Sequence, residues 1–178
     1  MDRMIYLSMS GAKAAMQRQE SLANNLANVS TPGFRAELQA FRAVPVQGSG
    51  ASTRVFTLET TIGHSDAPGQ VTATGRALDV AVKGESWLAV QALDGTEAYT
   101  RAGSLDLSAD GLFRTAGGEA LDADALARVQ EGALEGSNVS AVESMVEMIA
   151  AARQFEAQMK LLQTAEADEK AASQLLSF

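Results

Sequence analysis

Side chains that could act as a base, a nucleophile or a metal ligand are few in this sequence. Its 178 residues include one histidine and no cysteine. That histidine, His64, lies in the turn-like segment Gly63-His64-Ser65-Asp66, and no Gly-x-Ser-x-Gly elbow accompanies it. Because a catalytic base needs a positioned nucleophile and an orienting partner, His64 is interpreted as an exposed loop residue. We expect no enzymatic activity; a hydrolase with an unrecognised site is the alternative.

Candidate metal and cofactor sites are equally weak. Two pairs of aspartates could each contact a hard cation: Asp122 with Asp124, and Asp106 with Asp110. Neither pair has the spacing of an EF-hand loop. The glycine-containing segments 48–50 and 117–118 lack both the Lys-Ser/Thr of a phosphate-binding loop and the Gly-x-Gly-x-x-Gly spacing. We therefore expect no catalytic residue, no metal and no cofactor.

Composition and charge narrow the classes of partner. The net charge is −8, whereas binding to a nucleic acid backbone requires clustered Lys and Arg, so nucleic acid binding is not expected. No apolar run is long enough to form a transmembrane helix. The N-terminal residues lack a continuous apolar run, so a cleaved secretory signal is not expected either. Many of the hydrophobic residues are alanines and only 5% of residues are aromatic, which favours long helices in a larger assembly.

The N-terminal segment has the periodicity of an amphipathic helix of about 25 residues. Apolar side chains recur at alternating spacings of four and three: Ile5, Met9, Ala12, Met16, Ala23 and Leu26. Thr31-Pro32-Gly33 should end this helix, because proline lacks an N–H donor and disfavours helical geometry in the residue before it.

A second, longer helix is predicted from Ala141 to the C-terminus. Ser140 and Glu143 have the spacing of a capping box. An apolar stripe follows: Val142, Met145, Val146, Ile149, Ala152, Phe155, Met159 and Leu162. Neither terminal helix can bury its stripe alone, and a pair of helices still exposes its outer sides, so self-association is expected.

Between the helices the pattern is that of short β-strands. Strands are predicted at 54–61, 77–82, 86–92 and 98–101, with turns at Asp94-Gly95 and Asp110-Gly111 and a linker at 43–53. The predicted fold is α+β, in which N- and C-terminal helices pair as a coiled coil and a small all-β module is inserted. The expected domains are 1–30 with 139–178 (helical), 31–70 (extended linker and first β segment) and 71–138 (β-rich module).

Three sequence runs resemble the flagellar basal-body rod and hook proteins. LANNLANVSTPGFR (Leu22–Arg35) resembles the N-terminal signature of that family. The run Ala73–Gly111 resembles the start of its central β module, and GALEGSNVSAVESMVEMIAAARQFEAQMK (Gly132–Lys160) resembles its C-terminal signature. In the family a longer β stretch separates the segments that here meet at Asp110, Gly111 and Leu112. We therefore expect a shortened β module.

The resemblance implies a structural subunit of the bacterial flagellar rod, most similar to the proximal-rod members. Its terminal helices would polymerise into the axial drive shaft, with neighbouring proximal and distal rod proteins as partners. The flagellar type III export apparatus would deliver the chain, without signal cleavage, to the basal-body rod that crosses the periplasm. A distal-rod or hook-type axial subunit is the alternative within the family. A monomeric binding module on a helical stalk is the alternative from another class.

The asparagines near the end of the first helix allow two interpretations. Asn24, Asn25 and Asn28 could be solvated residues at a fraying helix end, or they could contact adjacent subunits; the motif match favours contact. The full set of predicted subunit-interface residues comprises the two helical stripes and the flanking motifs: Ile5, Met9, Ala12, Met16, Leu22, Asn24, Asn25, Leu26, Asn28, Thr31, Phe34, Ser137, Asn138, Val142, Met145, Ile149, Ala152, Phe155, Met159 and Leu162.

Overall fold

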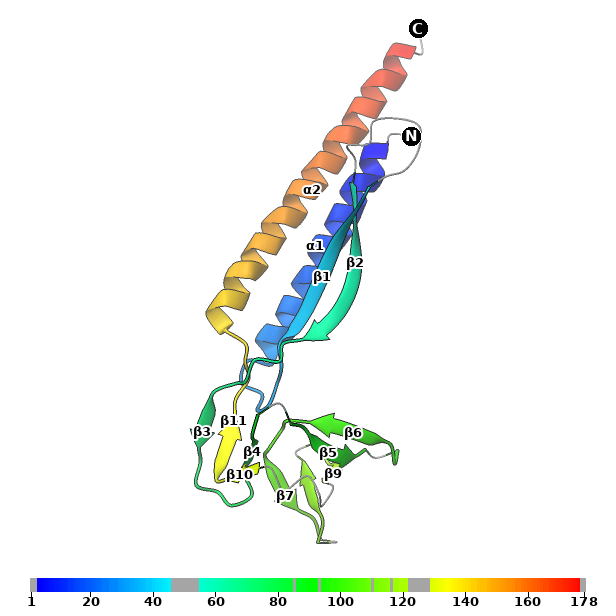
Figure 1. Ribbon diagram of the computed structural model, residues 1–178. Coiled ribbons are helices and arrows are strands. Elements are labelled where there is room, and N and C mark those ends of the chain that lie inside the picture. Colours follow the sequence, from blue (N-terminus) through cyan, green and yellow to red (C-terminus); the bar gives the residue numbers. More distant parts are fainter. Residues whose placement is uncertain are drawn as a thin grey trace. The chain divides into compact units, whose positions relative to one another are not determined.

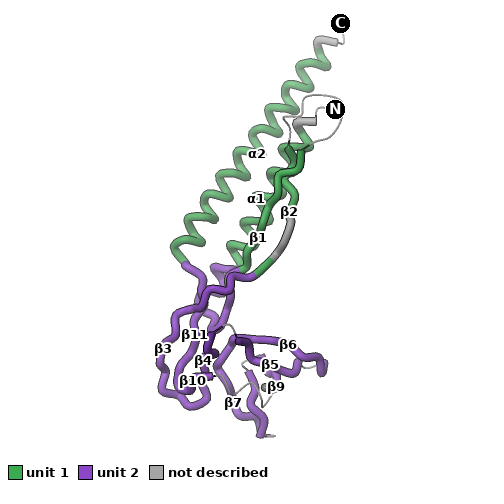
Figure 2. Tube along the Cα trace, in the orientation of Figure 1, with its two compact units in different colours: residues 1–24, 37–63, 141–178 green, residues 25–36, 64–140 purple. Residues whose placement is uncertain are grey.

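The computed structural model describes residues 3–45, 55–84, 86–92, 94–109, 111–115, 117–121 and 129–176. The chain divides into two compact units (Figure 2). The first, the helical unit, comprises Met1–Asn24, Glu37–Gly63 and Ala141–Phe178. The second, the β unit, comprises Asn25–Ala36 and His64–Ser140. Helices at both ends and many short antiparallel strands between them confirm the α+β class.

Both helices occur where the sequence predicts them. Helix α1 spans Arg3–Ala27, and Asn28, Val29 and Thr31 then form turn hydrogen bonds to carbonyls three residues earlier, before Pro32. Helix α2 spans Ala141–Leu176 and begins directly after Ser140. In the helical unit α1 and α2 run antiparallel (Figure 1). Within the described residues no helix has the length and apolar character needed to cross a bilayer.

A two-stranded sheet completes the helical unit, and the sequence pattern missed half of it. Strand β1 (Glu37–Pro45) pairs with β2 (Val55–His64) and lies along α1, where the Ser21 hydroxyl donates to the Glu37 carbonyl at 3.5 Å (Figure 1). The prediction of a linker at 43–53 is therefore wrong for residues 43–45, which are the last residues of β1. Residues 46–53 lie outside the described part of the chain. In β1, half-buried and exposed residues alternate from Glu37 to Arg42 in the manner of a strand with one covered face.

The β unit contains two ladders and a five-stranded sheet. Strands β3 (Val71–Ala73) and β4 (Val80–Val82) pair antiparallel with β11 (Ala133–Glu135) and β10 (Val129–Glu131), respectively. The five-stranded sheet has the order β6-β5-β9-β8-β7, with bounds β5 Leu88–Gln91, β6 Glu97–Thr100, β7 Leu105–Leu107, β8 Phe113–Thr115 and β9 Ala120–Leu121.

The core of the β unit is small and aliphatic. Val80, Val82, Leu88 and Leu105 are buried together, with Leu78 and Val129 packed against them. The strands predicted at 77–82 and 86–92 are present in shorter form as β4 and β5, and the one predicted at 98–101 is present as β6, one residue earlier. The alternating apolar residues that predicted β4 thus do form the core.

The point at which the two family-like segments meet is a tight hairpin. The Ser108 N–H donates to the Leu112 carbonyl at 2.9 Å, and the Gly111 N–H donates to the Ser108 carbonyl at 2.9 Å. Gly111 has a φ of 77°, which favours glycine. The strands on either side, β7 and β8, pair in continuous register from Leu105 opposite Thr115 to Leu107 opposite Phe113. The chain therefore closes here without any further structure.

A first prediction concerns close backbone packing in the β unit. The Val80 N–H donates to the Gly103 carbonyl at 2.8 Å, and a Cβ at Gly103 would overlap the Val80 carbonyl oxygen. Gly103→Ala should therefore lower the free energy of unfolding of the β unit by about 1–3 kcal/mol, because the two segments must separate. Urea unfolding followed by the fluorescence of Trp87, the single tryptophan, measures this.

The matched control is Gly117→Ala. There the nearest atom to an added Cβ would be Thr115 Oγ1 at 3.6 Å, an ordinary contact. Equal unfolding midpoints for the two variants would contradict the prediction.

Candidate functional site

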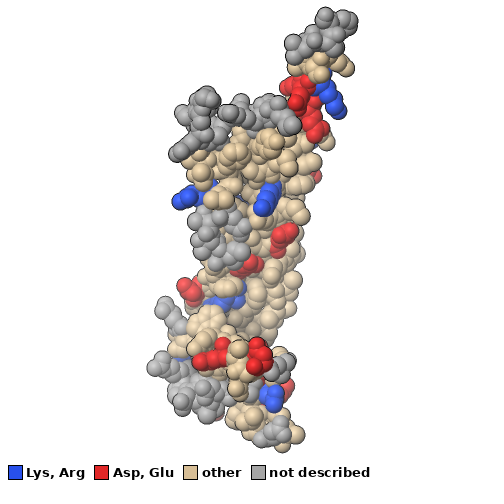
Figure 3. All heavy atoms as spheres, turned by 90° about the vertical axis from the view of Figure 1, so that its right-hand side faces the viewer, with Lys and Arg blue, Asp and Glu red and all other residues tan. Residues whose placement is uncertain are grey.

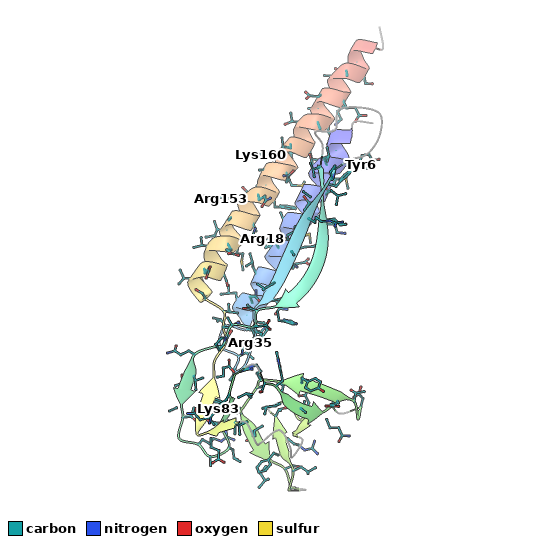
Figure 4. The ribbon with its side chains drawn as sticks, in the orientation of Figure 1. Tyr6, Arg18, Arg35, Lys83, Arg153 and Lys160 are labelled. Atoms are coloured by element: carbon teal, nitrogen blue, oxygen red, sulfur yellow. The ribbon has the colours of Figure 1, made fainter. Side chains whose placement is uncertain are left out.

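The buried residues of the two helices are mostly small. On α1 these are Ser8, Ala12, Ala15, Ser21, Leu22 and Asn25, and on α2 they are Ser144 and Ala151. The helices approach closely enough that a Cβ on Gly11 would lie 2.8 Å from Cδ of Gln158. Arg18 on α1 points toward α2 and pairs with Glu147 at 3.5 Å (Figure 4). Alanine, serine and glycine thus permit a close antiparallel approach.

Large apolar side chains lie on the outside instead. Val142 is 74% exposed and Ile149 56% exposed, and Met145 and Val146 between them are also exposed. At 3.6 residues per turn these positions lie roughly opposite the face of Ser144 and Ala151. Their exposure is a property of the isolated chain, of which Figure 3 shows one side with its charged residues coloured. The beginning of α2 therefore presents an apolar patch, which we call the α2 outer face (Val142, Met145, Val146 and Ile149).

Helix α1 has a smaller counterpart. Met9 and Met16 are each 54% exposed, and Tyr6 is equally exposed. We call these three residues the α1 outer face. Single exposed apolar residues are ordinary on monomers, but these residues are grouped on one side of the helix, which is typical of a binding surface.

The predicted interface residues fall into three classes of burial in the isolated chain. Three are buried: Ala12, Leu22 and Asn25. Ten are half-buried: Ile5, Leu26, Asn28, Phe34, Ser137, Asn138, Ala152, Phe155, Met159 and Leu162. Seven are exposed: Met9, Met16, Asn24, Thr31, Val142, Met145 and Ile149. Members up to Asn24 and from Val142 onward lie in the helical unit, whereas those from Asn25 to Phe34, with Ser137 and Asn138, belong to the β unit. Their contacts with other subunits stay a prediction.

A buried ion cluster at the centre of the β unit was missed by the sequence analysis. Glu135, 2% exposed at its side chain, lies between Arg35 and Arg101. Its Oε1 accepts from Arg35 Nη2 at 2.8 Å, and its Oε2 accepts from Arg101 Nε at 2.9 Å. The only signal for it was Glu135 itself, which shares the inward-facing side of β11 with Ala133.

Backbone carbonyls accept hydrogen bonds from Arg101, the second arginine of this cluster. Arg101 donates to the carbonyls of Val82 at 3.1 Å, Gly84 at 3.0 Å and Ser86 at 2.6 Å. Its guanidinium also lies 5.8 Å from the centroid of the Trp87 ring, within the range of a cation–π contact. Two arginines and one carboxylate can be buried together because the guanidinium donors find these additional acceptors.

Other charged groups give no further site. A pocket of about 420 Å³ adjoins the cluster, but Arg101 and Glu135 in its lining already pair with each other. Among the described residues no group of three His, Asp or Glu side chains could hold a metal ion. His64 is an exposed residue that ends β2, and Asp106 pairs with Arg76. Asp110, Asp122, Asp124 and segment 48–50 lie outside the described residues, and Gly117-Gly118 forms part of the turn before β9.

Three family models together match most of the sequence. The model "Flagella basal body rod protein" matches residues 5–35. "Flagellar hook protein FlgE/F/G D1 domain" matches residues 81–152, and "Flagellar basal body rod FlgEFG protein C-terminal" matches residues 130–175. The first of these matches contains Arg35, and Glu135 falls in both of the others.

Curated relatives extend the match to the whole chain. The flagellar basal-body rod protein FlgF of Salmonella typhimurium is 36% identical to it, with 100% of both chains covered. The chain belongs to the flagellar basal-body rod protein family. FlgF of Escherichia coli K12 is 35% identical over the same extent, and the rod protein FlgG of Agrobacterium fabrum is 30% identical over 65% of this chain and 50% of its own. The rod protein described here is a structural rod subunit of the flagellar basal body.

The alignment also shows that this rod protein is short. It runs over 250 positions against 178 residues, so at least 72 positions have no counterpart in this chain. The hairpin at Ser108–Leu112 is where the family resemblance leads us to expect this missing stretch. That location stays a prediction.

A second prediction tests the ion cluster. Glu135→Gln should lower the free energy of unfolding of the β unit by about 3 kcal/mol, because it leaves two buried guanidinium groups without a countercharge. Chemical unfolding followed by Trp87 fluorescence should report this directly, since Arg101 lies over that ring.

Glu131→Gln is the matched control. Glu131 is exposed and lies four residues earlier, on β10, so the same chemical change should have little effect. Similar losses of stability in the two variants would show that the cluster contributes nothing specific.

Proposed function

We propose that this rod subunit polymerises through the outer faces of its two terminal helices. The observation that carries the proposal is the α2 outer face, where Val142, Met145, Val146 and Ile149 are exposed opposite the buried side of the helix. Covering such a patch in an assembly removes apolar area from water and stabilises association. The occupants are the corresponding helices of neighbouring rod subunits, because the chain belongs to a family of rod proteins.

The internal packing of the helical unit supports this proposal. The buried residues of α1 and α2 are mostly small, and Gly11 lets α1 approach Gln158 of α2, so burial of the large apolar residues is left to other chains. The pairing of α1 with α2 as a coiled coil, with its seam continued between subunits, is part of the same proposal.

Within the rod we propose a proximal position. The two relatives aligned over their full length carry the name FlgF, while the FlgG relative aligns over half of its own length. Association with other rod components, delivery by the flagellar type III export apparatus without a cleaved signal, and a location crossing the periplasm follow as parts of this proposal. A distal-rod or hook-type position is the competing assignment.

A third prediction tests the α2 outer face. Ile149→Asp should block rod assembly while both units of the monomer stay folded. In the isolated chain the carboxylate is solvated, because Ile149 is 56% exposed, but in an assembled interface it would be buried unpaired at a cost of several kcal/mol. Motility on soft agar and electron microscopy of basal bodies, in cells whose own gene is deleted, measure assembly; circular dichroism and Trp87 fluorescence measure folding.

Two controls accompany this variant. Glu156→Gln removes an exposed charge seven residues further along α2, and Gln154→Asp adds a carboxylate at an exposed position on a different side of the helix. Both should leave rods intact. If Ile149→Asp subunits build normal rods, the α2 outer face is not the polymer contact, and the binding module on a helical stalk becomes the better interpretation.

A further inference from the structure

The chain passes between its two units at four places. The unit boundaries fall after Asn24, Ala36, Gly63 and Ser140. Any force that travels along the chain from one unit to the other must pass through these connections. The β-unit ends of three of them, residues 33–36, 65–70 and 135–138, are hydrogen-bonded to one another, and we call this group of segments the joint.

Backbone hydrogen bonds tie the three segments of the joint in pairs. The Gly33 N–H donates to the Glu135 carbonyl at 2.8 Å. The Ser65 N–H donates to the Ala36 carbonyl at 2.8 Å, and the Gly136 N–H donates to the Gln70 carbonyl at 2.9 Å. The packing is tight, because a Cβ at Gly69 would overlap the Gly136 carbonyl oxygen. Each segment is thus held by both of the others.

The Asn138 side chain, in the third segment, binds both of the others. Its Oδ1 accepts from the Ala36 N–H at 2.7 Å. Its Nδ2 donates to the carbonyls of Ser65 at 3.2 Å and Ala67 at 2.8 Å. The orientation of the amide is unambiguous, because an N–H can meet only the oxygen and the two carbonyls can meet only the nitrogen. The Asn138 N–H also donates to the Phe34 carbonyl at 3.3 Å. The buried Glu135 carboxylate also reaches both of the other segments, because its Oε1 accepts from Arg35 Nη2 at 2.8 Å and from the Gly69 N–H at 2.9 Å.

Asn138 differs from the residues of the buried ion cluster in its burial. Arg35 and Glu135 lie deep in the β unit, and Figure 4 shows Arg35 in the segment that follows α1. Asn138 is half-buried, and the aliphatic core of Val80, Val82, Leu88 and Leu105 does not include it. Its side chain can therefore be altered without opening that core. An amide is also the side chain that can accept from one segment while donating to another; Asp and Ala cannot do both.

We propose that Asn138 is a positioning residue for rod function, which locks the connections to the helical unit at fixed places on the β unit. In this proposal, any load on the rod reaches the β unit through these segments, which must therefore not slide past one another. This role requires membership of the rod family but does not depend on the α2 outer face, which lies on other residues.

The test compares Asn138→Ala and Asn138→Asp with the unaltered full-length chain. Amide hydrogen exchange should become faster by about tenfold at Ala36 and Ser65 in Asn138→Ala, because the hydrogen bonds that hold these segments are lost. The amides of β5, at Leu88 and Val90, should keep their protection. Asn138→Asp should behave similarly or worse, because it retains an acceptor for Ala36 but repels the carbonyls of Ser65 and Ala67.

The functional arm uses cells in which each variant replaces the native gene. Swimming in soft agar should be reduced at least to about half by either substitution, while Gln130→Ala, an exposed amide side chain on β10, should swim normally. Three results would overturn the proposal: unchanged exchange at Ala36 and Ser65, faster exchange there with normal swimming, or equal acceleration in β5. The last would show that Asn138 only stabilises the fold. Failure of Ile149→Asp to block assembly would leave this proposal untouched.

Discussion

A buried carboxylate shared by two guanidinium groups holds the β unit together. Removing Glu135, Arg35 and Arg101 from water is costly, and the cost is offset only because every part of the cluster meets a partner in a fixed place. Since those partners come from segments 34 and 100 residues apart, the cluster forms only when the whole β unit is in place. Arg35 and Glu135 also belong to two segments of the joint, so the cluster and the joint are held by the same stretches of chain.

The helical unit differs from the β unit, because its large apolar side chains are not buried in the isolated chain. Gly11 lets α1 approach Gln158 of α2, and the buried residues of these helices include Ala15 and Ala151, which bury little area each. The residues with the most apolar area, including Val142 and Ile149, remain in water. In the assembly proposed above, such a subunit would gain further helical packing from its neighbours, which suits a rod component.

This rod protein has fewer residues than its alignment with a full-length relative has positions. At least 72 aligned positions of its Salmonella relative have no counterpart here, yet the described strands still pair and still enclose a core. The hairpin at Ser108–Leu112 needs only one glycine with positive φ, Gly111, to close. The ion cluster, the joint and the aliphatic core all lie outside that hairpin.

Local pattern in the sequence determined the extents of both helices, the places of β2, β4, β5 and β6, and the family, because periodicity, caps and motifs are properties of neighbouring residues. It missed β1, whose Gln39 and Phe41 give only a weak alternation, and the short strands β3 and β7 to β11. Only the tertiary structure decided which side of α1 is buried. The spacing of four and three fits Ile5, Met9, Ala12 and Met16 as well as Ser8, Ala12, Ala15 and Leu22, and close approach selected the smaller set. Nor could local pattern pair Glu135 with two arginines or Asn138 with Ala36, since such contacts join segments far apart in the chain.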